Sequence, residues 1–188
     1  MKNFREKIYN QHDIICNQKY GDSLPYNFHL KAVEAQGSKF KHLVEHTEYE
    51  NKGNHVSSRF TSDELVQLAL LCHDCLEDAR LTYNDIRELG TEALHNTIGG
   101  EMLADIIYCV TDEKGKNRVE RKNEKYYKEL SNNKLAVFVK LADLAANTLY
   151  SKLTNSSMYE KYKTEFPKFK ERVYVEEYKE FFDYVENL

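Results

Sequence analysis

Apolar residues recur along most of this chain at the three- and four-residue spacing of an amphipathic helix. The strongest pattern, over residues 68–86, follows a capping-box pair at Thr61 and Glu64 and predicts one buried helix. Residues 99–110 and 135–153 are apolar on nearly every side, which predicts two further core helices. Helical periods therefore dominate, and we expect an all-α fold.

The sequence before residue 61 predicts two helices followed by a loop. Residues 3–20 predict an amphipathic helix, and its His12-Asp13 pair is interpreted as solvated surface because no acidic pair follows one turn later. Residues 25–44 predict a second helix that starts at a proline and continues past a glycine. The polar, glycine-containing residues 48–60 predict a loop. The buried stripe of the first helix is expected to contain Phe4, Ile8, Ile14 and Ile15.

The part of the chain after the central helix predicts more helices. Thr82 and Asp85 predict the cap of a short helix that ends at Gly90. The aromatic-rich residues 159–184 predict two helices that close the bundle. A chain of 188 residues is long enough for one domain with a substantial core, so we expect a single domain over residues 1–188.

The composition narrows the class of protein. Hydrophobic residues make up 41% of the chain, which has only 7 Gly, 2 Pro and no Trp, and this composition favours packed helices over turn-rich sheets. The net charge of -4 argues against a general nucleic-acid binder, although a local basic pocket remains possible. No apolar run is long enough to cross a bilayer and residues 1–13 lack the apolar segment of a signal peptide, so we expect a cytoplasmic protein without a membrane partner.

Four ionisable residues interrupt the central apolar pattern and are the candidate chemical centre: His73, Asp74, Glu77 and Asp78. On a helix with about 100° per residue, they would share an arc of roughly 140°. A buried carboxylate costs several kcal/mol unless it is paired or bound to a cation, which favours a metal site here. His73 and Asp74 would supply ligands, and Glu77 with Asp78 would hold or deprotonate a water. A polar helix surface is the alternative.

Two other apolar helices carry polar residues that could extend this centre. Asp143 and Asn147 are four residues apart on the predicted core helix, which suits a metal ligand with an amide that reaches a substrate. A buried aspartate with a structural partner is the alternative. His29 lies on an apolar stripe, where it could be either a ligand or a satisfied core residue.

Three further patterns allow other interpretations. HLVEH, from His42 to His46, matches the HxxEH pattern of a family of zinc peptidases, but no third ligand or peptide cleft is evident. Cys72 and Cys75 form a CxxC in the middle of the predicted helix, where reduced core thiols are favoured over a redox or zinc motif. A basic segment could be a solvated helix or a rim that holds phosphate oxygens. Its basic residues are Lys114, Lys116, Arg118, Arg121, Lys122 and Lys125.

PYNFH at 25–29, HDCLED at 73–78, VTDEK at 110–114 and KLADLAANT at 140–148 follow in that order. This series resembles the HD-domain phosphohydrolases, and among them the hydrolase domains of bacterial alarmone enzymes of the RelA/SpoT type and their small stand-alone relatives. The resemblance implies a compact HD-domain helical bundle. It also implies an enzyme that removes the 3′-pyrophosphate from guanosine tetra- or pentaphosphate.

The same resemblance implies a set of site residues. It implies one divalent metal ion, typically manganese, with four protein ligands, an acidic pair that activates the attacking water, and an asparagine that contacts the nucleotide sugar. The positions that match the metal ligands are His29, His73, Asp74 and Asp143. Glu77 and Asp78 match the acidic pair, and Asn147 matches the asparagine.

The chain also departs from this family. An Arg-Lys pair usually precedes PYxxH, and its arginine stacks on the base; here KYGDSLPY leaves that role to Tyr20 or Lys19. Lys140, Arg118 and Arg121 are the candidates to neutralise phosphate charge. Two alternatives stay open: an HD-type nucleotidase or phosphatase acting on an NADPH-like or deoxynucleotide substrate, and a nucleotide-binding HD protein without turnover. The oligomeric state is not predicted.

Overall fold

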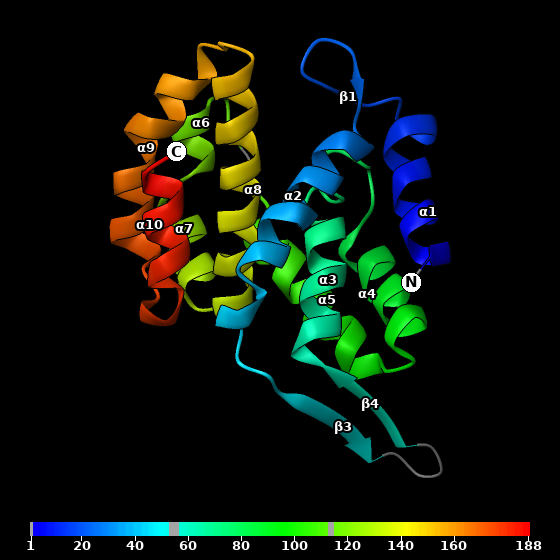
Figure 1. Cartoon of the computed structure of the whole chain (residues 1–188). Coiled ribbons are helices and arrows are strands. Elements are labelled where there is room, and N and C mark those ends of the chain that lie inside the picture. The colour runs from blue at the N-terminus through cyan, green and yellow to red at the C-terminus, as the bar shows by residue number, and fades with distance from the viewer. Residues whose placement is uncertain (1, 53–56, 113–114) are drawn as a thin grey trace.

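The computed structural model describes residues 2–52, 57–112 and 115–188, and most of its regular structure is helical, which confirms the all-α prediction (Figure 1). The helices are α1 (Lys2–Asn10), α2 (Asn27–Lys39), α3 (Ser62–Cys72), α4 (Tyr83–Leu94), α5 (Thr97–Val110), α6 (Arg118–Arg121), α7 (Glu124–Ser131), α8 (Lys134–Leu153), α9 (Met158–Val173) and α10 (Lys179–Glu186). Shorter turns are the π turn η1 (Gln11–Ile15) and the 3₁₀ turns η2 (Lys41–Leu43) and η3 (Glu176–Tyr178). Two small antiparallel hairpins pair β1 (Lys19–Tyr20) with β2 (Leu24–Pro25), and β3 (Glu48–Lys52) with β4 (Ser57–Thr61).

Helix α8 is the centre of the bundle. Residues 136–146 of this helix are all buried, as expected for a core helix. It packs against α2, α3 and α5 and also against α7, α9 and α10, and in Figure 1 these two groups lie on opposite sides of it. The predicted helices at 99–110 and 135–153 and the two closing helices are confirmed by α5, α8, α9 and α10. Among the described residues, no helix is both long and apolar enough to cross a membrane.

The N-terminal segment differs from its prediction. Phe4 and Ile8 are buried, but Ile14 and Ile15 are 71% and 68% exposed, whereas His12 is fully buried. The reason is that α1 ends at Asn10 and the wider π turn η1 follows, which changes the side of the chain that faces the core. Treating His12 and its neighbour Asp13 as solvated surface was therefore wrong. Asp13 accepts a 3.1 Å hydrogen bond from the backbone N–H of Asn27 at the start of α2.

The segment between α2 and α3 also differs. Helix α2 ends at Lys39, short of the predicted residue 44, and the 3₁₀ turn η2 follows. The predicted loop at 48–60 contains strands β3 and β4, and residues 53–56 lie outside the described ranges. The cross-strand neighbours Tyr49 and Phe60 stack with centroids 4.8 Å apart, which supplies an apolar contact that a local count of polar residues does not show.

The main difference from the prediction concerns the central helix expected over residues 68–86. Thr61 and Glu64 form the expected capping box, but α3 ends at Cys72, and residues 73–78 form consecutive turns. The expectation that the four ionisable residues share one helical face is therefore wrong, because tight turns and not a helix bring them together. Cys75 lies in these turns, so the CxxC is not in the middle of a helix. All four cysteines are free, in agreement with the prediction.

Helix α4 starts at the predicted Thr82 and Asp85 capping box but runs to Leu94 instead of ending at Gly90. The close packing of α4 against α5 explains why α4 continues past Gly90. A Cβ on Gly100 of α5 would lie 2.4 Å from the carbonyl oxygen of Arg87, so glycine is required where the two backbones meet. Gly90 lies inside α4 beside this contact and does not end the helix.

Candidate active site

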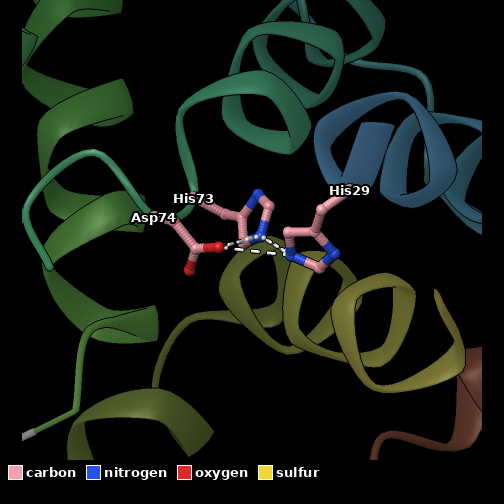
Figure 2. Close-up of side chains that lie close together, drawn as sticks. All are labelled: His29, His73 and Asp74. Atoms are coloured by element: carbon pink, nitrogen blue, oxygen red, sulfur yellow. Dashed lines mark hydrogen bonds and ion pairs between the residues drawn. The ribbon is translucent and has the colours of Figure 1, made fainter. Parts of the chain in front are cut away.

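His29 of α2 meets His73 and Asp74, which follow α3, at the surface of α8 (Figure 2). The two Nε2 atoms are 3.0 Å apart, and Asp74 Oδ2 lies 2.9 Å from His73 Nε2 and 3.2 Å from His29 Nε2. Donor atoms that are each about 2.1 Å from one metal ion lie about 3.0–3.4 Å apart, between right-angle and tetrahedral geometry. The three side chains thus have the spacing of ligands around one cation.

The orientation of His73 fits this role. Its Nδ1 lies 2.9 Å from the carbonyl oxygen of Leu70, which can only accept, so Nδ1 carries the hydrogen and Nε2 has a free lone pair. The second imidazole, His29, is covered by the ring of Tyr20, with centroids 4.6 Å apart and planes 22° apart. Two imidazole nitrogens and a carboxylate oxygen suit manganese, iron, nickel or zinc by ligand type.

Asp143, on α8, adjoins this cluster. Its Oδ1 lies 3.4 Å from His29 Nε2, and its Oδ2 lies 3.1 Å from the ammonium nitrogen of Lys140. The amide of Asn147 donates a hydrogen bond to the same carboxylate. Burial by itself would raise the pKa of Asp143, but Lys140 and His29 hold it well below its ordinary value. The predicted fourth ligand is therefore a carboxylate beside the three-residue cluster.

Tyr26 connects the cluster to the acidic pair. Its hydroxyl oxygen lies 2.6 Å from Asp74 Oδ2 and 2.8 Å from Asp78 Oδ2. One hydroxyl hydrogen cannot serve two carboxylates, so the second contact requires a proton on one of them. Burial and the charge of Asp74 raise the pKa of Asp78, which makes Asp78 the easier of the two carboxylates to protonate.

The two members of the acidic pair face different surroundings. Glu77 lines a cavity of about 170 Å³ beside the cluster, where its Oε1 accepts a 2.7 Å hydrogen bond from the backbone N–H of Asp112. Burial raises the pKa of Glu77. Asp78 lies behind Tyr26, and Gln18 donates a 2.9 Å hydrogen bond to its backbone carbonyl. Of the two, Glu77 is the one placed to meet a molecule in the cavity.

This cavity, which we call the cluster cavity, collects most of the predicted substrate residues. Tyr20, Arg118, Arg121, Lys140 and Asn147 line it, whereas Lys19 is exposed on β1 and does not. The full lining consists of Tyr20, Tyr26, His29, Asp74, Glu77, Asp112, Arg118, Arg121, Lys122, Lys140, Asp143, Leu144, Asn147 and Tyr162.

The basic segment is part solvated surface and part cavity wall. Lys116 and Lys125 are exposed, while Arg118, Arg121 and Lys122 line the cluster cavity. The guanidinium of Arg118 is already engaged, because its Nε donates to both carboxylate oxygens of Glu165 at 2.8 and 3.0 Å. Lys114, like the end of the VTDEK motif, lies outside the described residues.

Five residues of the cluster cavity were not among the predicted site residues: Tyr26, Asp112, Lys122, Leu144 and Tyr162. Four of them lie in stretches already singled out, since Tyr26 belongs to PYNFH, Asp112 to VTDEK, Lys122 to the basic segment and Leu144 to KLADLAANT. Nothing in the sequence marks Tyr162 as a site residue except that it belongs to a predicted aromatic-rich helix. These stretches were recognised, but which of their side chains face the cavity depends on how α6 and α9 pack.

The HLVEH segment does not form a comparable centre. Because α2 ends at Lys39, His42 and His46 are not one turn apart on a helix. His42 Nε2 pairs with Glu180 at 3.0 Å, while His46 is 4.0 Å from Glu48, and both histidines are exposed. The zinc-peptidase interpretation therefore lacks its ligand geometry. Within the described ranges, the one group of three or more residues spaced to hold a metal ion is His29, His73 and Asp74.

Comparison with known proteins adds no further information about the family. No protein-family model matches the chain, and no curated protein matches it significantly. The resemblance in motif order therefore stays a prediction, and the chemistry has to be argued from the site itself.

Proposed function

We propose that this chain is a metal-dependent phosphohydrolase of a small nucleotide, with guanosine 3′,5′-bis(diphosphate) as substrate and its 3′-pyrophosphate as the group removed. The observation that carries the proposal is the cluster of His29, His73 and Asp74, with donor atoms 2.9–3.2 Å apart, beside a cavity whose lining includes four Lys or Arg side chains. Metal and cationic side chains together are what hydrolysis of a phosphate ester requires.

The cluster would hold one divalent ion, manganese by the resemblance, with Asp143 as an adjacent fourth carboxylate. A bound ion of this kind supplies a water of lowered pKa and polarises a phosphoryl oxygen. Glu77 is the residue that accepts the proton of the attacking water, because it lines the cavity and its raised pKa suits a general base. Tyr26 positions Asp74 through its hydrogen bond.

Three side chains would neutralise the phosphate oxygens. Lys140 is buried beside Asp143, and Arg121 and Lys122 line the same cavity without an ion pair among the described residues. Arg118 contributes less, since Glu165 already holds its guanidinium. A phosphate that enters the cavity therefore meets two cations, Arg121 and Lys122, that have no ion-pair partner in the described part of the chain, together with Lys140, which is paired with Asp143.

The nucleoside would lie against Tyr20 and Asn147. The hydroxyl of Tyr20 donates a 2.8 Å hydrogen bond to the amide oxygen of Asn147, so the two residues form one wall of the cavity. A tyrosine ring can stack on a purine, and an amide can bond to a ribose hydroxyl.

A second candidate keeps the chemistry and changes the substrate to an NADPH-like or deoxynucleotide ligand. The observation that favours it is Tyr20, a neutral ring that is already bonded to Asn147, at the position where the resembled family has a base-stacking arginine. Without the arginine cation to stack on the base, the argument that the base of the substrate is guanine is weaker.

The test is release of phosphate and pyrophosphate from a nucleotide panel, with manganese or with chelator, by the native protein and Asp74→Ala. The panel contains guanosine 3′,5′-bis(diphosphate), its adenosine counterpart, NADPH and common nucleoside mono- and triphosphates. Manganese-dependent pyrophosphate release from the guanosine compound, lost in Asp74→Ala, is expected. Release from another member would overturn the substrate, and release from none would leave a nucleotide-binding protein without turnover.

A further inference from the structure

Tyr20, on strand β1, packs directly against the cluster of His29, His73 and Asp74. Its ring stacks on the imidazole of His29, with centroids 4.6 Å apart and planes 22° apart. It also meets the ring of Tyr26 edge-on, with centroids 6.3 Å apart, and Tyr26 bonds to Asp74. The face of the Tyr20 ring that covers His29 is therefore closed to a nucleotide base.

The hydroxyl of Tyr20 begins a chain of hydrogen bonds that ends at the cluster. It donates to Oδ1 of Asn147 at 2.8 Å, and Nδ2 of Asn147 donates to Oδ1 of Asp143. A carboxylate only accepts hydrogen bonds, so the amide nitrogen must face Asp143 and the amide oxygen must face Tyr20. Oδ1 of Asp143 lies 3.4 Å from His29 Nε2 and 3.8 Å from His73 Nε2. The chain thus ends on the oxygen that faces both imidazoles.

Helix α8 fixes the hairpin that carries Tyr20. Asp143, Asn147 and Tyr150 follow one another at spacings of four and three residues, so they form one stripe along this helix. The ring of Tyr150 lies 4.5 Å from the ring of Tyr20. Gly21 has a φ of +59°, and a Cβ there would lie 2.1 Å from the hydroxyl oxygen of Tyr150. Glycine lets the hairpin approach α8 without displacing Tyr150, which keeps Tyr20 within hydrogen-bond reach of Asn147.

We propose that Tyr20 is a positioning residue of the metal site. Its hydroxyl fixes the amide of Asn147, which in turn holds Oδ1 of Asp143 towards the cluster, while its ring holds the imidazole of His29. Groups that orient metal ligands in this way raise the affinity of a site for its ion. The inference rests on the proposed function for the presence of a metal ion, and it gives Tyr20 a role that does not depend on a bound nucleotide.

Calorimetric titration with manganese, in the absence of nucleotide, tests this role. Tyr20→Phe keeps the ring over His29 and removes only the hydroxyl, and we expect it to lower the manganese affinity about tenfold. The matched control is Tyr184→Phe, which also removes a hydroxyl that donates to a side-chain amide, here Oε1 of Gln36 at 3.1 Å, between α10 and α2. The control should bind manganese like the native protein.

A double-mutant cycle shows whether Tyr20 acts through Asn147. Asn147→Ala breaks the same chain at its middle, so adding Tyr20→Phe to it should lower the manganese affinity by no more than about twofold further. Losses that multiply in the double variant would show that the hydroxyl acts on the metal site by another route, and would overturn the inference. Urea unfolding in the presence of chelator checks that each variant is folded.

The outcomes separate this inference from the proposed function. Native manganese affinity in Tyr20→Phe, the result that a base-stacking role alone predicts, would overturn the inference and leave the metal site standing. An equal loss in Tyr20→Phe and Tyr184→Phe would overturn it too, because the effect would not be specific to the cluster. A native protein that binds no manganese would overturn both the inference and the metal-dependent function. If the expected pattern appears but no nucleotide of the panel is hydrolysed, the positioning role stands and the phosphohydrolase function fails.

Discussion

The imidazole of His12 lies flat against the phenol ring of Tyr26, with ring centroids 4.7 Å apart and planes 7° apart. His12 comes from the π turn η1, and its Nε2 is 3.7 Å from the thiol of Cys75 in the turns after α3. The same tyrosine hydroxyl contacts Asp74 and Asp78. The N-terminal segment therefore supports the acidic side of the candidate active site from behind.

Replacing His12 tests this support. His12→Ala removes a fully buried ring and should lower the free energy of unfolding by about 2–3 kcal/mol through the cavity it leaves. His12→Phe retains a ring against Tyr26 and removes the buried Nδ1, which has no partner among the described residues, so it should recover most of that loss. Urea midpoints at unchanged slope measure both effects. Equal destabilisation by the two variants would contradict the stacking argument.

Tyr26→Phe removes only the hydroxyl group that links Asp74 to Asp78. Without it, the two carboxylates lose their shared hydrogen-bond partner, and we expect activity or manganese affinity to fall about 10- to 100-fold, as for other groups that orient a ligand. The matched control is Tyr83→Phe, which removes a 2.6 Å hydrogen bond to Asp105 on the surface. Similar losses in both variants would show that the effect is not specific to the cluster.

Manganese binding should depend on the cluster and not on the HLVEH segment. We expect His73→Ala and Asp74→Ala each to abolish binding of one equivalent of manganese in calorimetric titration, because each removes a donor atom of the three-residue group. The double variant of His42→Ala and His46→Ala should bind like the native protein, since both histidines are exposed and apart from the cluster.

The same ligands should couple metal binding to stability. At manganese concentrations about 100 times the Kd, binding to the folded state alone adds about 2.7 kcal/mol to the free energy of unfolding. Chelator should remove this increment from the native protein, and Asp74→Ala should not show it. A native protein whose thermal midpoint does not respond to manganese would argue against the site.

Lys122 gives the pH dependence of stability a defined sign. Its pKa is lowered to about 8 by burial and by Lys140 and Arg118, so the folded state binds its proton less tightly than the unfolded chain. This residue therefore opposes folding below pH 8, and the penalty disappears as the pH rises from about 8 towards the ordinary lysine value. Lys122→Met should raise the free energy of unfolding at pH 7 and lose that advantage towards pH 10.

Urea denaturation across this pH range, in buffer without phosphate, measures the effect. Lys161→Met controls for the loss of one positive charge from the exposed surface of α9. A Lys122→Met variant that is less stable than the native protein at pH 7 would show that the ammonium group has a stabilising partner and would contradict the burial argument.

Several elements could be predicted because their causes are local. The capping boxes at Thr61 and Thr82 need only residues within one turn, and the apolar character of α5 and α8 is a property of those segments alone. Ionisable residues such as Asp143 in an apolar segment likewise mark a place where burial needs compensation, whichever partner supplies it.

Other features depend on partners far away in the chain. Helix α3 ends at Cys72 because the turns after it bring Asp74 to His29 and Tyr26, and no local spacing contains those contacts. The burial of His12 depends on the ring of Tyr26. Lys168 and Arg172 share a cavity with Arg118 and Lys122 only because α9 packs beside α6. Periodicity within the sequence thus determined which segments are helices and which residues carry the chemistry, whereas tertiary packing decided where helices end and which charges meet, because those outcomes depend on interactions between distant residues.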